Sequence, residues 1–270
     1  MKPGTLLLAL LLFAFWSERA FALSPNELNH LGYDQHLGQT ISRDLLFRDS
    51  EKRTVSIGEL LTKKPTLLVL GYYHCPMLCT LINDGLIESL QELRFDVGRD
   101  FNVINLSVDP NETPEVAAAK KREYLKRYGR HGAEAGWHFL TGDKQSIAQI
   151  TNEAGLRFAY DPATHEYAHP SGFVVLTPEG KISRYFFGVN YDPRELRSAI
   201  IAASRGEKGS IVQQLILLCF HYNPITGKYG QLVLTVLRIL GTATVVVLGG
   251  WLFWLSRSGP RKTAVDGSGA

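Results

Sequence analysis

The sequence predicts an α/β domain, with helices on both faces of a central mixed sheet, and one C-terminal transmembrane helix. Two observations predict the domain: apolar runs of strand length alternate with stretches of helical periodicity, and a strand hairpin follows them. A third observation, the long apolar run at 232–255, predicts the membrane helix. With 270 residues, 45% hydrophobic and 20% charged, the chain suffices for one well-cored domain plus shorter additional segments.

The predicted elements run in the order β-α-β-α-α-β-β-β-α after an initial hairpin at 45–57. The first strand and helix are expected at 67–73 and 81–93. A strand at 101–107 then leads into a helix that has Thr113 as N-cap and Pro114 at its first position, and Gly129 ends it. The remaining predictions are a helix at 143–153, strands at 157–160, 173–177 and 182–187, and a last helix at 192–204.

Both ends of the chain carry apolar segments. Residues 1–22 have the pattern of a cleaved signal peptide, with a retained N-terminal anchor as the alternative. Residues 232–255 predict a transmembrane helix, with a buried core helix as the alternative, and the basic residues after it place the C-terminus in the cytoplasm. We therefore expect a single-pass protein of the inner (cytoplasmic) membrane, with its main domain on the periplasmic, extracytoplasmic side.

These observations divide the chain into six segments. They are a signal peptide at 1–22, an N-terminal extension at 23–39, the α/β domain at 40–205, a membrane-proximal segment at 206–231, the transmembrane helix at 232–255 and a cytoplasmic tail at 256–270.

The pair Cys75 and Cys79 stands where the first strand gives way to the first helix. Cys75 is expected at or just before the first helical turn, where unpaired backbone N–H groups and the helix dipole favour a thiolate, and Cys79 is expected inside that turn. If both residues are helical, a spacing of four brings the thiols close enough to form a disulfide or to chelate one soft metal ion. Three cysteines are too few for a disulfide scaffold, so the pair predicts redox or metal chemistry. A static disulfide or two buried thiols are the structural alternative.

His169 closes the loop at 161–170, directly before a predicted strand, and in a sheet of this type that loop faces the cysteine turn. A neutral imidazole there completes a site of two sulfurs and one nitrogen, whereas a polar surface residue is the alternative. Such a site suits Cu(I), Cu(II) or Zn(II), although zinc normally takes a fourth ligand. His74 is expected to point away, and the histidines expected on loops or the surface are His131, His138 and His165.

The chain offers little else that carries chemistry. Its net charge is +3, and outside the flank of the C-terminal apolar run it has no basic patch interleaved with aromatic residues. No nucleic-acid partner is therefore expected. Cys219 and His221 could form a second metal or thiol site near the membrane, and interfacial packing is the favoured alternative for them.

Three motifs in this order resemble those of the Sco/SenC family of copper proteins, over residues 35–205: Tyr73-His-Cys-Pro-Met-Leu-Cys79, Ser107-Val-Asp-Pro-Asn-Glu-Thr-Pro-Glu115 and Ala168-His-Pro-Ser-Gly-Phe173. The resemblance implies a thioredoxin-like fold held at a membrane and a role in assembling the binuclear copper centre of cytochrome c oxidase. It also implies a copper ion bound by Cys75, Cys79 and His169. The chain resembles the branch with a cleaved signal and a C-terminal anchor, and it departs from better-known members in the Gly-Tyr-Tyr-His before its first cysteine.

We therefore predict a membrane-tethered periplasmic protein that delivers copper to a respiratory oxidase during assembly of its CuA-type centre. Its partner would be the copper-bearing subunit of that oxidase or another copper or thiol protein. The alternative is a thiol–disulfide oxidoreductase whose catalytic redox pair, Cys75 and Cys79, reduces the recipient's cysteines. Peroxide reduction is a weaker enzymatic reading, and a structural domain with an inert disulfide is a third class.

Overall fold

The computed structural model describes residues 31–75, 78–162, 164–207, 239–244, 247–248 and 251. The α/β domain belongs to the first of two compact units, Met1–Gln214, and the second unit is Leu215–Ala270. The predicted signal peptide, most of the predicted transmembrane segment, the cytoplasmic tail, Cys219 and His221 lie outside the described residues. Within the described part of the chain, no helix is long and apolar enough to cross a membrane.

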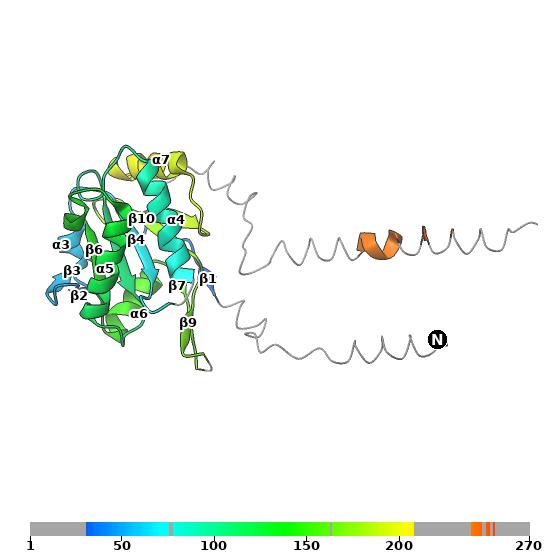
Figure 1. The fold of residues 1–270 in the computed structure, drawn as a ribbon, viewed down its shortest axis with the longest axis horizontal. Coiled ribbons are helices and arrows are strands. Elements are labelled where there is room, and N and C mark those ends of the chain that lie inside the picture. The colour runs from blue at the N-terminus through cyan, green and yellow to red at the C-terminus, as the bar shows by residue number, and fades with distance from the viewer. Residues whose placement is uncertain are drawn as a thin grey trace, which may run out of the picture. The chain divides into compact units, whose positions relative to one another are not determined.

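A mixed sheet of seven strands forms the centre of the domain, in the spatial order β11-β10-β4-β5-β6-β2-β3 (Figure 1). Its parallel middle consists of β4 (Thr66–Gly71), β5 (Asn102–Ser107) and β6 (Trp137–Thr141). Antiparallel strands border this middle on both sides: β10 (Gly172–Leu176), β11 (Ile182–Phe187), β2 (Leu46–Asp49) and β3 (Thr54–Ser56). The predicted α/β domain with a central mixed sheet is confirmed.

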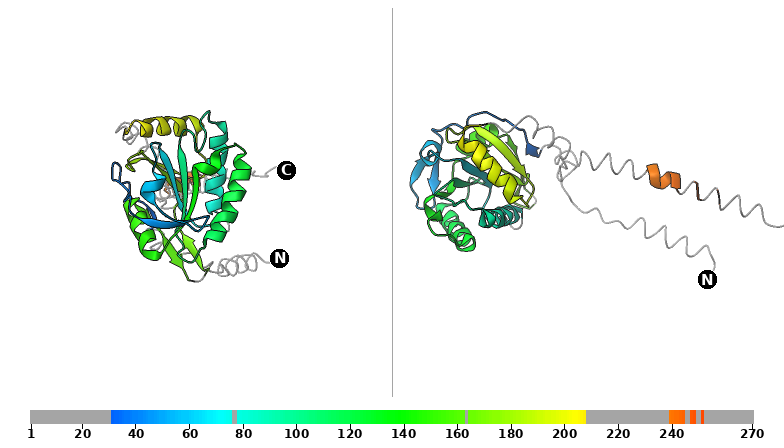
Figure 2. Two further views of the ribbon diagram at one scale, coloured as in Figure 1. Left: turned by 90° about the vertical axis from the view of Figure 1, so that its left-hand side faces the viewer. Right: turned by 90° about the horizontal axis from the view of Figure 1, so that it is seen from above.

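Helices cover both faces of the sheet, as predicted (Figure 2). One face carries α4 (Leu78–Glu92), α5 (Pro114–Tyr128) and α7 (Pro193–Ser204). The other face carries α3 (Ile57–Leu60) and α6 (Lys144–Glu153). A short 3₁₀ helix at Ala133–Ala135 precedes β6.

The side chains of β4 alternate between the two hydrophobic cores of the domain. Leu67 and Val69 pack into the core on the α4 side, whereas Leu68 and Leu70 pack into the core on the α6 side. Successive side chains of a strand point to opposite faces, so both layers of helices bury this strand. The apolar run seen in the sequence is therefore a central strand, and it carries the chain to the cysteine pair.

The predicted element order omits β6, and this is the main correction to the fold. The strand is five residues long, and His138 interrupts its apolar character. Trp137 and Phe139 face the core on the α4 side, while His138 is half-buried rather than exposed on a loop. Burial lowers the pKa of His138 to about 4, with a smaller contribution from Lys121.

The segment predicted as one strand at 157–160 is also different. It is divided between β7 (Leu156–Arg157), which pairs with β1 (Gly32–Tyr33), and β8 (Ala159–Asp161), which pairs with β9 (Glu166–Ala168). The expected loop at 161–170 therefore contains one arm of a hairpin. This hairpin leads the chain directly to His169 and β10.

Candidate metal centre

Cys75 and Cys79 lie just beyond the carboxyl end of β4, and both are present as thiols. Cys79 is in the first turn of α4, as expected, and it is buried. Cys75 precedes Leu78, the first residue of α4, and is half-buried. The backbone N–H of Cys79 donates to Cys75 Sγ at 3.2 Å. Cys75 thus accepts one of the N–H groups that a helix start leaves unpaired.

His169 reaches the cysteine pair through the register of the sheet. β10 runs antiparallel to β4 with Val174 opposite Leu68, so the start of β10 lies beside the end of β4. His169 is only 3% exposed, and its Nε2 lies 2.9 Å from Cys79 Sγ. One ligand atom from each of Cys75, Cys79 and His169 lies within 4.8 Å of the others. The structure therefore brings together all three residues that the sequence singled out.

The hydrogen bond of the second ring nitrogen determines the tautomer of His169. Nδ1 lies 3.0 Å from the carbonyl oxygen of Pro170, and a carbonyl oxygen only accepts. Nδ1 must therefore carry the proton, which leaves the lone pair of the neutral ring on Nε2, facing Cys79 Sγ. This is the tautomer that a metal ion held by Cys79 and His169 requires.

Burial controls the charge of Cys79. It raises the pKa of the Cys79 thiol, and the hydrogen bond and charge of Cys75 raise it further, while the N–H of Tyr72, 3.4 Å from Sγ, opposes them. Desolvation therefore outweighs the helix terminus at Cys79, whereas the thiolate expected at the helix start concerns Cys75. A bound cation would replace this proton and compensate the buried negative charge.

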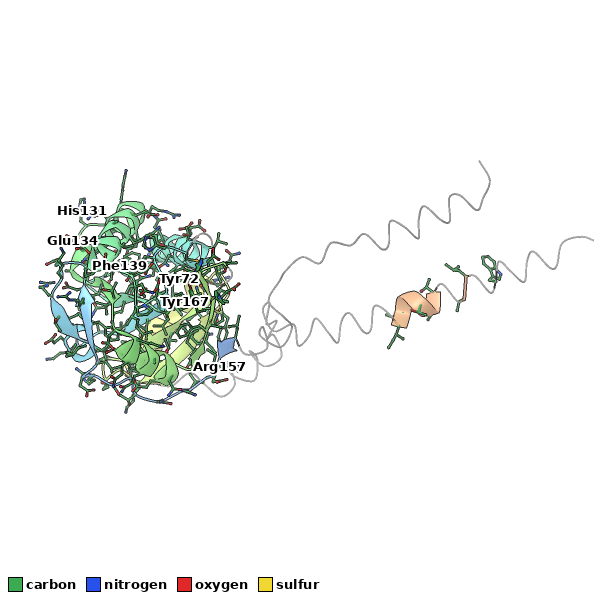
Figure 3. The ribbon with its side chains drawn as sticks, turned by 90° about the horizontal axis from the view of Figure 1, so that it is seen from below. Tyr72, His131, Glu134, Phe139, Arg157 and Tyr167 are labelled. Carbon is green, nitrogen blue, oxygen red and sulfur yellow. The ribbon has the colours of Figure 1, made fainter. Side chains whose placement is uncertain are left out.

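Gly71 and Tyr72, which precede Cys75 in the sequence, shape the pocket around the two sulfur atoms. A Cβ on Gly71 would lie 3.1 Å from Cys79 Sγ, so glycine lets the sulfur pack against the backbone. The ring of Tyr72 packs edge-on against His169, with 6.0 Å between the ring centroids. It also packs edge-on against Tyr167, with 5.8 Å between centroids, and Figure 3 shows these two tyrosines close together. The Tyr72 side chain also hydrogen-bonds with Cys75. Tyr72 was not predicted as part of the site, and the paired tyrosines Tyr72 and Tyr73 before the first cysteine are its only signal in the sequence.

Of the other histidines considered from the sequence, those within the described residues lie outside the group of Cys75, Cys79 and His169. The His74 side chain is 67% exposed, and its Nδ1 lies 2.9 Å from Glu112 Oε1. His131 is exposed, and His165 is exposed and hydrogen-bonded to Tyr160.

The donor set fits a soft metal ion. Two sulfurs and one neutral imidazole nitrogen converge, and sulfur ligands select copper or zinc over magnesium and calcium. Three protein ligands match the low coordination number that Cu(I) accepts, whereas a structural zinc site is normally closed by a fourth protein ligand.

Comparison with known proteins gives a family and a fold. The model of the SCO1/SenC family matches residues 34–204. Among solved structures, the chain is similar to a protein of Aquifex aeolicus VF5 assigned to electron transfer, with 30% identity and a TM-score of 0.55, over 63% of this chain and 95% of that one. Comparison with curated proteins gives no match.

Two further solved structures are similar at lower identity. A SCO1/SenC family lipoprotein of Bacillus anthracis str. Ames has 16% identity and a TM-score of 0.50, over 64% of this chain and 98% of that one. Arabidopsis thaliana ScoI, solved with copper bound, has 21% identity and a TM-score of 0.47, over 63% of this chain and 99% of that one. The family model covers more than half of the sequence, and the chain therefore belongs to the SCO1/SenC family.

Proposed function

We propose that this protein is a copper metallochaperone that binds one copper ion through Cys75, Cys79 and His169. It delivers this ion to a respiratory oxidase during assembly of the CuA-type centre. The observation that carries the proposal is the convergence of two sulfurs and one imidazole nitrogen within 4.8 Å. Membership of the SCO1/SenC family supports the same reading.

The unequal burial of the three residues suits transfer rather than permanent storage. Cys79 and His169 are buried, whereas Cys75 is half-buried and accessible to a recipient. A cysteine thiolate of the recipient would bind the copper ion as Cys75 releases it, and the bonds to Cys79 and His169 would break afterwards. Cys79 would then take up a proton, because burial favours its neutral form. Copper changes ligands in this exchange, Cys79 regains an S–H bond with a proton from the recipient's thiol or from solvent, and no disulfide is made or broken.

Membrane tethering forms part of the proposal and is supported by the sequence. The apolar segments 1–22 and 232–255 are the features that favour export of the domain and its attachment to the inner membrane. A tethered domain searches a thin layer above the membrane, so its effective concentration near a membrane-bound oxidase subunit is high.

Anaerobic copper titration of the reduced full-length protein tests the proposal. We expect one tightly bound copper ion per chain in the wild type. The His169→Ala variant should bind copper at least about 100-fold more weakly, because it loses a direct ligand. Losing a residue that only hydrogen-bonds to a metal ligand already lowers metal affinity about 10–100-fold. His131→Ala, which removes an exposed histidine outside the group, serves as the matched control and should bind like the wild type. A wild-type protein that takes up no copper would overturn the proposal.

A second candidate function rests on the two thiols themselves. Cys75 and Cys79 are four residues apart, and the more accessible Cys75 could attack a disulfide of the recipient while Cys79 resolves the mixed disulfide. Two thiols would be oxidised to one disulfide, and the recipient's disulfide would be reduced to two thiols. Disulfide reduction that is abolished in Cys75→Ser and unchanged in His169→Ala, without copper uptake, would favour this function.

A further inference from the structure

Glu112 is a buried acidic residue whose carboxylate faces the segment before Cys75. Its side chain is 1% exposed. Oε2 accepts the backbone N–H of Tyr73 at 2.8 Å, and Oε1 accepts the backbone N–H of His74 at 2.6 Å. The hydroxyl of Ser107 donates to Oε2 at 2.6 Å, and the ring of His74 lies against Oε1. Both carboxylate oxygens of Glu112 therefore accept hydrogen bonds from the segment before Cys75, and one of them also accepts a hydrogen bond from the end of β5.

The position of Glu112 follows from the register of two parallel strands. Ser107, the last residue of β5, is paired with Gly71, the last residue of β4. The Asp-Pro turn after Ser107 brings Glu112 back over the carboxyl ends of these strands, where the chain leaves β4 for the cysteine pair. The motif at 107–115, which in the sequence marks the end of a strand, the start of a helix and the family resemblance, thus also brings Glu112 against the segment before Cys75.

The three candidate ligands depend on different parts of the fold. Cys79 is held by α4, and His169 is held by its bond to the Pro170 carbonyl and by the start of β10. Cys75 belongs to neither a strand nor a helix. Its position depends on the preceding residues, whose backbone N–H groups donate to Glu112.

The side chain of Tyr73 completes the attachment of this segment. Its hydroxyl lies 2.9 Å from the carbonyl oxygen of Asn105 and 2.8 Å from that of Leu140, on β5 and β6. Tyr73 is therefore fixed to the sheet at its ring and to Glu112 at its backbone. The segment that carries Cys75 is thus attached both to the sheet and to Glu112.

We propose that Glu112 is a positioning residue of the metal centre, which holds the backbone of Tyr73 and His74 so that Cys75 Sγ stays within reach of Cys79 and His169. This inference rests on the proposed copper binding, and it assigns the role to a residue whose hydrogen bonds go to the backbone before Cys75 and to Ser107.

Glu112→Gln is the variant that separates hydrogen bonding from size. Glutamine has nearly the shape of glutamate but keeps one acceptor oxygen, and its NH₂ group can only donate. In either orientation of the amide, the NH₂ group faces the backbone N–H of Tyr73 or that of His74. One attachment of the turn is lost while the three ligands are unchanged.

Copper affinity and the thiolate-to-Cu(II) charge-transfer band of the full-length protein test this proposal. We expect Glu112→Gln to bind one copper ion about 10–100-fold more weakly than the wild type, the usual effect of losing a residue that orients a ligand. We also expect its charge-transfer band to shift, because the Cys75 sulfur changes position. Glu115→Gln is the matched control: the same chemical change in the same motif, at an exposed residue that pairs with Lys52, should leave affinity and spectrum unchanged.

The outcomes separate this inference from the proposed function. Wild-type affinity and an unshifted band in Glu112→Gln would overturn the positioning role while copper binding by the wild type stands. Absence of copper binding in the wild type would instead overturn the proposed function. A lowered unfolding midpoint shows that part of the Glu112→Gln protein is unfolded, and that fraction alone lowers the apparent copper affinity. If it accounts for the whole loss of affinity and the charge-transfer band does not move, Glu112 has a merely structural role and the proposal fails.

A second variant decides the matter if Glu112→Gln does not fold. Glu112→Asp keeps both acceptor oxygens at a shorter reach, and we expect folded protein with an intermediate affinity and an intermediate band position. A folded Glu112→Asp protein with wild-type affinity and spectrum would contradict the proposal.

Discussion

The two halves of the candidate metal centre differ in how firmly the fold holds them. Cys79 and His169 are buried, their ligand atoms are 2.9 Å apart, and they lie on α4 and at the start of β10. Cys75 is half-buried and lies on a short segment between β4 and α4. The centre therefore combines a preformed pair of ligands with one accessible ligand. This arrangement is expected at a site where an ion must both bind and leave.

The largest effect that separates the two halves should appear in thiol alkylation of the reduced, metal-free protein. Cys75 should react with iodoacetamide at least about ten times faster than Cys79, because one unit of raised pKa already lowers the thiolate fraction tenfold and burial also blocks the reagent. Peptide mass spectrometry identifies the modified residue at each time point. In guanidinium chloride the difference should disappear. Equal alkylation rates of Cys75 and Cys79 in the folded protein would contradict the difference in burial between the two cysteines.

The stability of the domain that holds the candidate metal centre should also depend on pH, and this dependence arises at His138 in β6. Burial lowers the pKa of His138 to about 4, so between about pH 6.5 and pH 4 the unfolded chain binds a proton that the folded chain does not. The free energy of unfolding should therefore decrease as the pH falls through this range, by at most about 3 kcal/mol.

Urea unfolding of the wild type and of His138→Gln at several pH values measures this smaller effect. The variant lacks the titrating ring, so its free energy of unfolding should depend less on pH between 4 and 6.5. The same dependence in both proteins would assign the acid sensitivity to other groups.

The features that the sequence predicted well are those with a local signal. The apolar run of β4, the start of α4 at the cysteine pair and the histidine before β10 can all be recognised within short windows. The strand β6 was missed because it is short and contains His138. Its place in the sheet follows from pairing with β5.

The parts of the centre that could not be predicted depend on residues far apart in the sequence. Glu112 contacts Tyr73 and His74, and Tyr72 packs on His169, through the register of separate strands. No periodicity or capping pattern in the sequence predicts such long-range contacts. The raised pKa of Cys79 could not be predicted for the same reason, because its burial depends on the assembled core.

X-ray absorption spectroscopy at the copper edge tests whether both sulfurs and His169 bind one copper ion. In the full-length protein loaded with one equivalent of copper, the account predicts two sulfur ligands and one imidazole nitrogen. Cys75→Ser should retain one sulfur, and His169→Ala should retain two sulfurs and lose the imidazole signal. A wild-type spectrum with fewer than two sulfurs, or one that His169→Ala leaves unchanged, would contradict the account.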